Sequence, residues 1–385
     1  MLLIGGPGLS ALGQRRERSV WVGTWASAPM AGRPSPTLAG RTLRQIVRTS
    51  VAGREVRIRV SNLFGARPLR IEDIHLAIAS TGSAIIGGTD RTVRIAHRKS
   101  AVVAAGSSLV SDPVSMELPA LTEVAVSFYL PVDPGPVTWH PSAHRTNYLA
   151  SGDVSGQIEL PHAATTGSCY FLTNVDVRGK ELTGTVVTLG ASITEGYKAT
   201  EEANDQWPDI LAQRLVIQGL KVGVLNEGIS GNRLLHAGAG PSAESRFERD
   251  VVEQPGIRWV IFSDDPINDL GSTRPAPALG ALIRGTEQLI AAAHKNHIRF
   301  YCSTLTPFEG ANYWTPAEEL TRERFNEFIR GKGSGCDAVI DQDEITHDPA
   351  RPPRFLSAYD SGDHLHPNDA GHRAIAEAID LSVFH

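Results

Sequence analysis

Cysteine is scarce in this chain, which has only three among its 385 residues, at Cys169, Cys302 and Cys336. Three scattered cysteines are too few for a disulfide framework, and they lack the close spacing of a zinc knuckle. At most one pair can form, and the sequence does not select which. Buried free thiols are therefore the expected state of all three side chains.

Long apolar runs and excess positive charge are also missing. No apolar run approaches the roughly 20 residues that a helix needs to cross a bilayer. The formal net charge is −5 and the pI is about 6.2, so no basic field attracts nucleic acid. We therefore expect neither a membrane span nor a nucleic-acid partner. What remains is a globular chain, 41% hydrophobic and 21% charged, that is long enough for two domains.

The N-terminal residues 1–19 allow two interpretations. Residues 1–13 are mildly apolar and are followed by the basic run Arg15-Arg16-Glu17-Arg18. A secretory signal carries its positive charge before the apolar stretch, whereas here the charge comes after it. A truncated export signal and a disordered leader both remain open, and with them a secreted, periplasmic or cytoplasmic location.

Residues 20–178 are typical of a β-rich domain. Val56, Ile58 and Val60 alternate with Arg57 and Arg59, which indicates a half-buried strand with a charged outer face. The same alternation recurs at 124–130, and further strands are expected at 71–78, 93–97 and 102–110. Repeated short strands separated by turn residues predict an antiparallel β-sandwich or jelly roll.

Residues 179–385 change to a rhythm of strand followed by helix. Strands are expected at 186–189, 221–225, 259–262, 299–303 and 338–340, and helices at 205–220, 279–296, 315–331 and 369–381. Thr315-Pro316-Ala317-Glu318 is a capping box with proline at the first helical position. Alternating strands and helices predict a parallel sheet covered on both faces.

Three polar loops follow strands of this predicted sheet. Ser192 comes after the first strand, residues 226–232 after the second, and residues 264–269 after the third. Ligands of parallel sheets bind beyond the carboxyl ends of the strands, so the three loops should meet at one edge. This convergence is a stronger argument for a functional site than any of the loops alone.

Asp363 and His366 supply the remaining chemistry. A carboxylate three residues before an imidazole can orient it, which leaves the other ring nitrogen free to activate Ser192 as a nucleophile. Gly231 and Asn268 fit an oxyanion hole, since a glycine exposes its N–H and an asparagine offers a neutral donor. The chain thus holds the parts of a serine acyl hydrolase, although its Gly-x-Ser lacks the second glycine of the α/β-hydrolase elbow.

Structural interpretations of the same residues remain. Ser192 suits a helix N-cap, glycine and asparagine occur in turns for local reasons, and Asp363 with His366 suits a structural pair. A metal site built on His364, His366 and His372 is disfavoured because no second cluster has metal-ligand spacing. We expect no metal and no cofactor.

The four blocks, taken in order, resemble those of the SGNH (GDSL-type) hydrolase family. They are Ser192 in Gly-x-Ser-Ile-Thr, Gly231 in Asn-x-Gly-Ile-Ser-Gly-Asn, Asn268 in Ile-Asn-Asp, and Asp363 and His366 in Asp-x-x-His-Pro-Asn. The N-terminal half is similar to the β-rich domain of a bacterial subgroup described as arylesterases, acylhydrolases or carbohydrate esterases. The resemblance implies a flavodoxin-like α/β/α sandwich, metal-independent ester hydrolysis and an acyl-serine intermediate. It also implies that the N–H groups of Ser192 and Gly231 and the Asn268 side chain are the oxyanion donors.

Two positions depart from the family pattern. Ala191 replaces the aspartate of Gly-Asp-Ser, a change expected to affect the geometry of the loop rather than the chemistry. Pro266 replaces a glycine and is expected to shift Asn268, while Asp264 and Asp265 add negative charge near an anion site.

The function predicted from the sequence is a serine esterase that removes a short acyl group, acetyl included, from a carbohydrate or aryl ester. Asn232, Trp139 and His140 are the predicted substrate contacts, with packing as the alternative for the last two. Two other functions stay open: a glycan-binding protein with a degraded site, and an acyltransferase that uses the same serine. The expected partner is a small-molecule or glycan ester, and the oligomeric state is not predicted.

Overall fold

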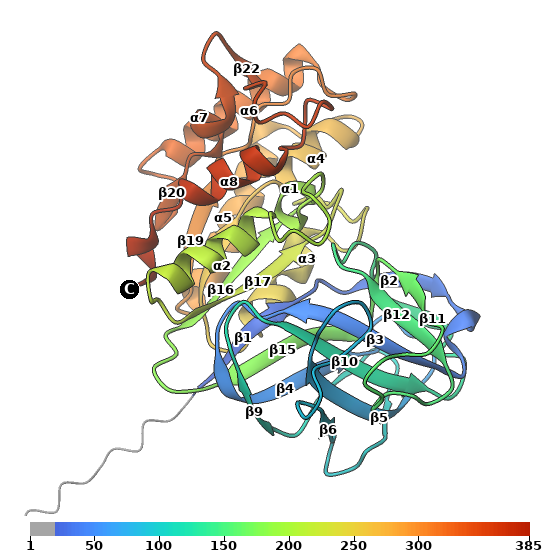
Figure 1. Cartoon of the computed structure of the whole chain (residues 1–385). Coiled ribbons are helices and arrows are strands. Elements are labelled where there is room, and N and C mark those ends of the chain that lie inside the picture. Colours follow the sequence, from blue (N-terminus) through green and yellow to red (C-terminus); the bar gives the residue numbers. More distant parts are fainter. Residues whose placement is uncertain (1–19) are drawn as a thin grey trace, which may run out of the picture.

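A computed structural model describes residues 20–385, so the leader predicted at residues 1–19 lies outside the described part of the chain. Figure 1 shows two parts, a β-rich N-terminal half and a half of alternating strands and helices that carries the C-terminus. No helix within the described residues is both long enough and apolar enough to cross a bilayer.

The N-terminal half consists of antiparallel sheets, as the alternating pattern predicts. The first sheet contains β1 (Trp21–Ala26), β15 (Leu172–Arg178), β4 (Gly53–Ser61), β8 (Ser108–Val110) and β9 (Val114–Leu118). The second contains β13 (Ala164–Thr166), β12 (Asn147–Ser151), β3 (Arg41–Arg48), β10 (Glu123–Leu130), β5 (Leu69–Ile78), β6 (Arg91–Val93) and β7 (Ala101–Val103). A third joins β14 (Cys169–Tyr170), β11 (Pro136–His140) and β2 (Met30–Pro34), and the short helix η1 (Pro36–Leu38) follows β2.

The core between these sheets is formed by the inward-facing side of each alternating strand. Val56, Ile58 and Val60 of β4 are all completely buried. The strand predicted at 93–97 is wrong beyond its first residue: β6 covers Arg91–Val93, and Ala96 and His97 adopt positive φ, which an extended strand does not allow. The run expected at 102–110 is divided into β7 and β8 by a turn that contains Gly106.

The C-terminal half is built on one parallel sheet with the strand order β17-β16-β18-β19-β20. The strands are β16 (Gly184–Gly190), β17 (Val222–Gly228), β18 (Ile257–Phe262), β19 (Arg299–Ser303) and β20 (Ala338–Ile340). Numbered along the chain, this is the flavodoxin-like order 2-1-3-4-5. In such sheets the switch point lies between the first and third strands, which here are β16 and β18.

Helices cover both faces of this sheet and confirm the α/β/α sandwich. One face packs against α2 (Trp207–Ile217), α8 (Asp369–Glu377) and η3 (Leu381–Phe384), and the other against α3 (Ala243–Phe247), η2 (Glu248–Val252), α5 (Leu279–Lys295) and α6 (Pro316–Arg330). The remaining elements are α1 (Ser192–Glu195), α4 (Asp265–Ser272), α7 (Gln342–Thr346), β21 (His347–Asp348) and β22 (Arg351–Phe355). The Thr315 side chain caps α6 by accepting from the Glu318 N–H at 3.3 Å, as the capping box predicts.

One prediction about the cysteines is wrong. Cys302 and Cys336 form a disulfide, whereas Cys169 is free and buried. Cys302 lies in β19 and Cys336 comes just before β20, and the parallel pairing of these strands brings the two Cα atoms within 5.8 Å. The pairing depends on strand neighbours that are 34 residues apart, which a count of cysteines does not contain.

The two halves meet where β1 crosses the edge strand β17. Gly223 of β17 approaches Gly23 of β1 so closely that a Cβ atom on Gly223 would lie 1.9 Å from the Gly23 carbonyl oxygen. The Ser50 hydroxyl accepts from the Val224 N–H at 2.9 Å, and the Gly23 N–H donates to Thr185 Oγ1 at 3.0 Å. The β-sandwich therefore covers the outer edge of the parallel sheet.

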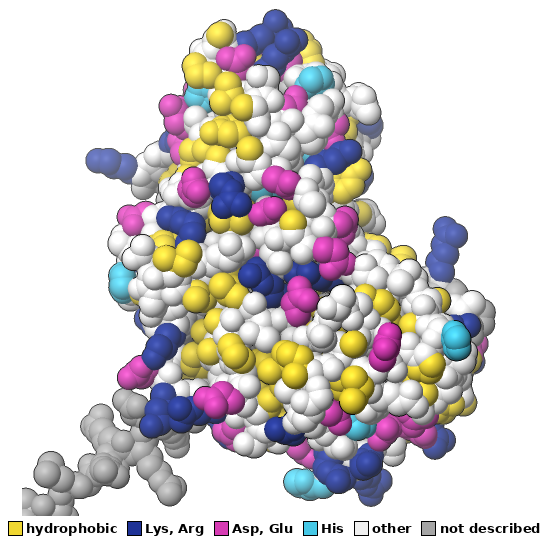
Figure 2. Space-filling view, viewed as in Figure 1, with side chains coloured by type: hydrophobic (Ala, Val, Ile, Leu, Met, Phe, Trp, Pro, Cys, Tyr) yellow, Lys and Arg dark blue, Asp and Glu magenta, His cyan; other side chains and the backbone are white. Residues whose placement is uncertain are grey.

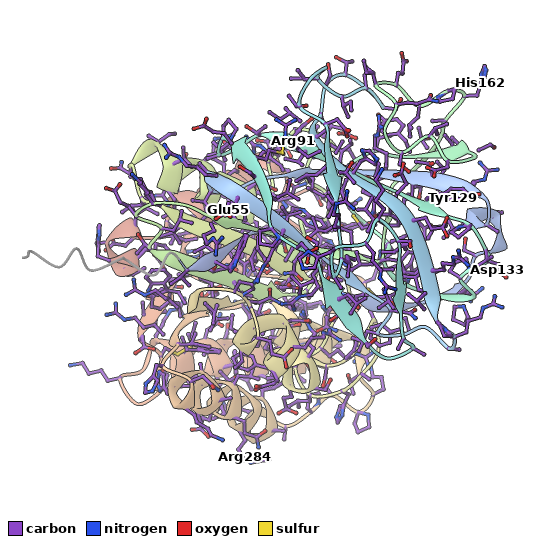
Figure 3. The ribbon with its side chains drawn as sticks, turned by 90° about the horizontal axis from the view of Figure 1, so that it is seen from below. Glu55, Arg91, Tyr129, Asp133, His162 and Arg284 are labelled. Atoms are coloured by element: carbon purple, nitrogen blue, oxygen red, sulfur yellow. A yellow bond between two sulfur atoms is a disulfide. The ribbon has the colours of Figure 1, made fainter. Side chains whose placement is uncertain are left out.

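Charged side chains of both signs are interspersed over this face of both halves, as Figure 2 shows. Seen from below in Figure 3, Arg284 of α5 and His162 of the β-sandwich lie at opposite margins of the molecule.

Candidate active site

Ser192, His366 and Asp363 form a continuous hydrogen-bonded chain. Ser192 Oγ lies 2.9 Å from His366 Nε2, and His366 Nδ1 lies 2.8 Å from Asp363 Oδ2. Asp363 Oδ1 also accepts from the His366 N–H at 2.9 Å, so a single carboxylate fixes both the backbone and the ring of the histidine. Burial tends to raise the pKa of Asp363, but the hydrogen bonds from His366 outweigh it and lower that pKa. The carboxylate stays ionised beside the ring.

Ser192 lies just beyond the carboxyl end of β16 and is the first residue of α1. Its side chain is buried by surrounding loops, with only 7% of the residue exposed. The carboxylate of Asp264, at the end of β18, accepts from the Ala191 N–H at 3.0 Å, the Ile193 N–H at 2.8 Å and the Thr194 hydroxyl at 2.6 Å. The loop that holds the serine is therefore braced by the neighbouring strand across the switch point.

The bracing of the serine loop by Asp264 explains how the loop can carry alanine at position 191. A carboxylate at position 191 was expected to be needed for loop geometry, and the carboxylate of Asp264 occupies the loop from the next strand instead. Asp264 points its charge at N–H groups of the serine loop, so the predicted conflict with an anion site is not observed for this residue.

Pro266 suits its place in the backbone. It lies in the first turn of α4, where a backbone N–H has no helical partner and proline is favoured. Asn268, two residues on, is buried in the same helix. Its amide group donates to the Asn232 carbonyl at 3.0 Å, and its carbonyl oxygen accepts from Tyr313 Oη at 3.3 Å.

The expected oxyanion donors retain free capacity. Among residues 20–385, neither the N–H of Ser192 nor that of Gly231 donates to a protein acceptor. Gly231 has a φ of 76°, a left-handed conformation that glycine adopts without strain. The amide of Asn268 has two hydrogens and uses one on Asn232, so the second is available.

Tyr313 fixes the orientation of the Asn268 amide through a hydrogen bond. We expect Tyr313→Phe to lower kcat about 5- to 20-fold with little change in KM, because losing this hydrogen bond frees the amide to rotate. Steady-state kinetics on a nitrophenyl ester measure this. Tyr301→Phe is the matched control, since the Tyr301 hydroxyl donates to the Val383 carbonyl at 2.6 Å, far from the serine loop. Equal kcat values for the two variants contradict the role of Tyr313.

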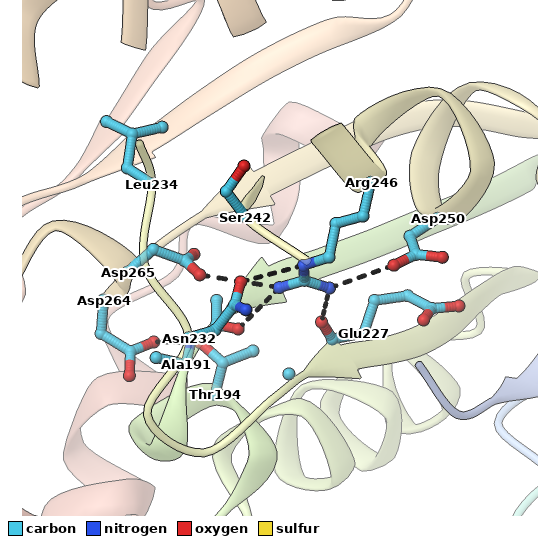
Figure 4. Close-up of polar contacts among 12 residues, drawn as sticks. Ala191, Thr194, Glu227, Asn232, Leu234, Ser242, Arg246, Asp250, Asp264 and Asp265 are labelled. Carbon is cyan, nitrogen blue, oxygen red and sulfur yellow. Dashed lines mark hydrogen bonds and ion pairs between the residues drawn. The ribbon is translucent and has the colours of Figure 1, made fainter. Parts of the chain in front are cut away.

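A buried arginine connects the loops of the site (Figure 4). Arg246 of α3 has no exposed surface, and it donates to the carbonyls of Gly190 at 3.0 Å and Glu227 at 2.5 Å. It also donates to Asn232 Oδ1 at 3.0 Å and forms ion pairs with Asp250 at 3.3 Å and Asp265 at 3.6 Å. One side chain thus joins the ends of β16 and β17 to the start of α4.

Two acidic residues after β18, Asp265 and Asp269, have raised pKa values. Burial raises the pKa of Asp265 to about 7, with Arg246 opposing the shift and Asp264 and Asp269 adding to it. Burial likewise raises the pKa of Asp269 to about 6, against two hydrogen bonds from the N–H groups of Leu234 and Leu235. The negative charge expected from Asp265 is therefore reduced near neutral pH.

The predicted substrate contacts are placed differently from the expectation. Asn232 is fully buried, and its amide donates to the carbonyls of Ala239 and Pro241, both at 2.7 Å. Trp139 and His140 lie in strand β11 rather than in a loop, and Trp139 packs on Tyr170 at 6.1 Å between ring centroids. His140 is buried against Ala28 and Glu195. Asn232 and His140 are thus buried among internal partners and Trp139 is half-buried, and their contact with a substrate stays a prediction.

The three histidines considered for a metal have separate partners. His364 pairs with Asp360, His366 with Asp363, and His372 faces the Tyr197 carbonyl at 3.4 Å. Within residues 20–385, no group of three or more His, Cys, Asp or Glu side chains is arranged to hold a metal ion.

Sequence reasoning missed Asp264 as a brace, Arg246, Tyr313 and Tyr197. Tyr197 is 43% exposed and packs its ring edge-on against His366, with 4.7 Å between ring centroids. The one sequence signal for Asp264 was its position directly after a predicted strand. No sequence signal indicated a role for Arg246, Tyr313 or Tyr197.

Comparison with known proteins finds a family model that matches the part of the chain that carries the site. Residues 188–374 match the GDSL-like lipase/acylhydrolase family. Similar solved structures include a lipolytic protein of the G-D-S-L family from Desulfitobacterium hafniense, with 23% identity over 51% of this chain and 97% of that chain and a TM-score of 0.40. A GDSL-like lipase from Bacteroides thetaiotaomicron has 17% identity over 52% of this chain and 88% of that chain, with a TM-score of 0.40. A variant of an acetyl xylan esterase from Geobacillus stearothermophilus has 19% identity over 51% and 92%, with a TM-score of 0.39. No curated protein matches the chain.

Proposed function

Because residues 188–374 form a carboxylic ester hydrolase domain of the GDSL-like lipase/acylhydrolase family, we propose that this protein is a serine esterase that removes short acyl groups from carbohydrate or aryl esters. The observation that carries the proposal is the unbroken chain of hydrogen bonds from Ser192 through His366 to Asp363. Acetyl is one of the short acyl groups that we propose this protein removes.

In the first half-reaction, Ser192 Oγ attacks the ester carbonyl while His366 Nε2 takes its proton. Asp363 holds the ring so that Nε2 faces the hydroxyl, and it balances the positive charge that develops on the imidazole. The N–H groups of Ser192 and Gly231 and the free amide hydrogen of Asn268 stabilise the oxyanion. His366 then protonates the departing alcohol, which leaves an acyl-serine.

In the second half-reaction, His366 deprotonates a water molecule, and the resulting attack on the acyl-serine releases the acid and restores Ser192. No step requires a metal, because the donors around Ser192 are N–H and amide groups.

The surroundings of the triad support the substrate class. Ser192 is only 7% exposed, a setting that favours a small acyl group over a long chain. Tyr197, exposed beside His366, offers an aromatic surface on which a sugar or aryl ring of the alcohol can stack, and Lys198 Nζ lies 5.2 Å from the centre of that ring.

A series of nitrophenyl esters from acetate to octanoate tests the acyl part of the proposal. We expect kcat/KM to be highest for acetate and to fall by at least about tenfold by octanoate, since each methylene that does not fit loses its binding energy. The alcohol part is tested with Tyr197→Ala, which should reduce kcat/KM more for an acetylated sugar than for methyl acetate. A preference for octanoate, or equal losses on the two alcohols, refutes the corresponding part.

A further inference from the structure

A buried ion pair joins the β-sandwich to the serine loop. His140 Nε2 of β11 lies 3.0 Å from Oε1 of Glu195, the last residue of α1, and the two side chains are 7% and 3% exposed. His140 Nδ1 lies 2.9 Å from the Ala28 carbonyl oxygen. A carbonyl and a carboxylate accept only, so both ring nitrogens carry hydrogen and the ring is an imidazolium.

Glu195 extends this contact to the second loop of the site. Its carboxylate accepts from the Ser230 N–H at 3.1 Å and from the Ser230 hydroxyl. Ser230 is bonded directly to Gly231, the residue whose left-handed backbone presents an oxyanion donor. The Asn226 side chain donates to the Thr194 carbonyl at 2.9 Å and reinforces the same junction. Glu195 thus touches both loops that supply backbone donors.

We propose that His140 is a positioning residue for ester hydrolysis: by holding Glu195 against Ser230, it sets the separation of the Ser192 and Gly231 N–H groups. The inference rests on the proposed esterase function. It assigns the β-sandwich a part in building the oxyanion hole, because the imidazolium comes from that half of the chain and the two N–H groups from the other.

Charge makes this contact stronger than an apolar one and sensitive to pH. Burial and the more distant Arg246 tend to lower the pKa of His140, whereas the hydrogen bond and charge of Glu195 outweigh them and raise it above the ordinary 6.5. The pKa of Glu195 is lowered, because His140 and Ser230 outweigh its burial. A cavity of about 90 Å³ lies between the domains beside the pair, and its other titratable wall residues are Arg48, His144, Arg145 and Asp209.

The sign of the pH effect follows. A raised histidine pKa means that the ion pair persists to a higher pH than an ordinary imidazolium does, and that it is lost as the pH rises through that pKa. The wild-type kcat should therefore fall as the pH rises beyond the ordinary histidine pKa. A variant without the imidazole should lack that fall.

The test compares His140→Gln with His75→Gln in the full chain. His75 is a matched control, since it is a buried histidine of the same sandwich, paired with Asp90 at 2.9 Å. For nitrophenyl acetate we expect His140→Gln to lower kcat about 10- to 100-fold with KM within about threefold, because removing one oxyanion donor has effects of that order or larger. His75→Gln should keep the wild-type kcat.

A boronic acid inhibitor, which forms a tetrahedral adduct with the serine, provides a second readout. Its Ki should rise in His140→Gln in parallel with the loss of kcat/KM, since adduct and transition state use the same donors. Ser230→Ala, which keeps the ion pair but removes the hydroxyl, should show a smaller loss of the same kind. Ser230→Ala also tests the proposal if His140→Gln fails to fold.

The outcomes separate the two proposals. If wild type has no turnover that depends on Ser192, the proposed function fails and this inference fails with it. If wild type is active and both His140→Gln and Ser230→Ala match it in kcat, in Ki and in the alkaline fall, only the inference is overturned. A lowered melting temperature with unchanged kinetics also overturns it, because the pair then only joins the domains.

Discussion

Ser192→Ala lowers kcat for nitrophenyl acetate roughly 10,000- to 1,000,000-fold in our expectation, as does His366→Ala, because triad members act as a unit. The variant should retain the fold, since within the described residues the Ser192 hydroxyl hydrogen-bonds to His366 Nε2 alone. The double variant should lose hardly more than either single one. Stopped assays at high enzyme concentration measure the residual rate against a blank.

Ser263→Ala is the matched control for this prediction. Ser263 also follows a strand of the parallel sheet, and its hydroxyl donates to Gln342 at 3.3 Å rather than to a base. Its kcat should stay within about threefold of wild type, as expected for a serine that takes no part in acyl transfer. Mass spectrometry after treatment with a fluorophosphonate should find the adduct on Ser192 alone. Substantial turnover by Ser192→Ala would rule out the acyl-serine route.

Arg246→Met reduces the free energy of unfolding by about 3–5 kcal/mol in our expectation, the range for breaking a buried ion pair by removing one partner. Methionine fills similar space but leaves Asp265 without its cation and Asp250 with Arg249 alone, and it removes one donor from each of three carbonyl or amide oxygens. Activity should fall as well, because the arginine binds the Gly190 carbonyl just before the serine loop. Urea denaturation followed by fluorescence and by activity measures both effects.

The loss in Arg246→Met should grow with pH. Without the arginine the pKa of Asp265 rises beyond its value of about 7, so the folded variant keeps a proton that the unfolded chain releases near pH 4. Stability therefore declines as the pH rises from about 4 through that pKa, and the deficit is larger at pH 8 than at pH 5.5. Arg330→Met, which removes a 36% exposed arginine paired with Asp341, should lose no more than about 1 kcal/mol. Equal losses for the two arginines would contradict the argument.

Much of the α/β half could be predicted because its signals are local. A buried run followed by Gly190 and Ser192 identifies a strand and its loop, and a separation of three positions between Asp363 and His366 is enough to place the two side chains together. The strand–helix alternation then brings the loops to one edge, since parallel strands all end on the same side.

The rest depends on contacts between residues far apart in the chain. Asp264 braces the loop at Ala191 from 73 positions further along the chain, and only the adjacency of β16 and β18 reveals this contact. The partners of His140, Tyr313 and Arg246 depend on how helices and domains pack. Alternation predicted that Trp139 and His140 lie in a β-rich region, but it did not distinguish a loop near the site from an internal strand.

The crossing of Gly23 and Gly223 has a consequence for the solubility of the separate halves. An open parallel sheet offers an unpaired strand edge to other molecules, and β17 is such an edge. In the whole chain β1 lies against it, and the Ser50 hydroxyl already occupies the Val224 N–H. The β-sandwich therefore protects the parallel sheet from edge-to-edge aggregation. A C-terminal half expressed alone would expose the edge of β17 and would be prone to aggregate.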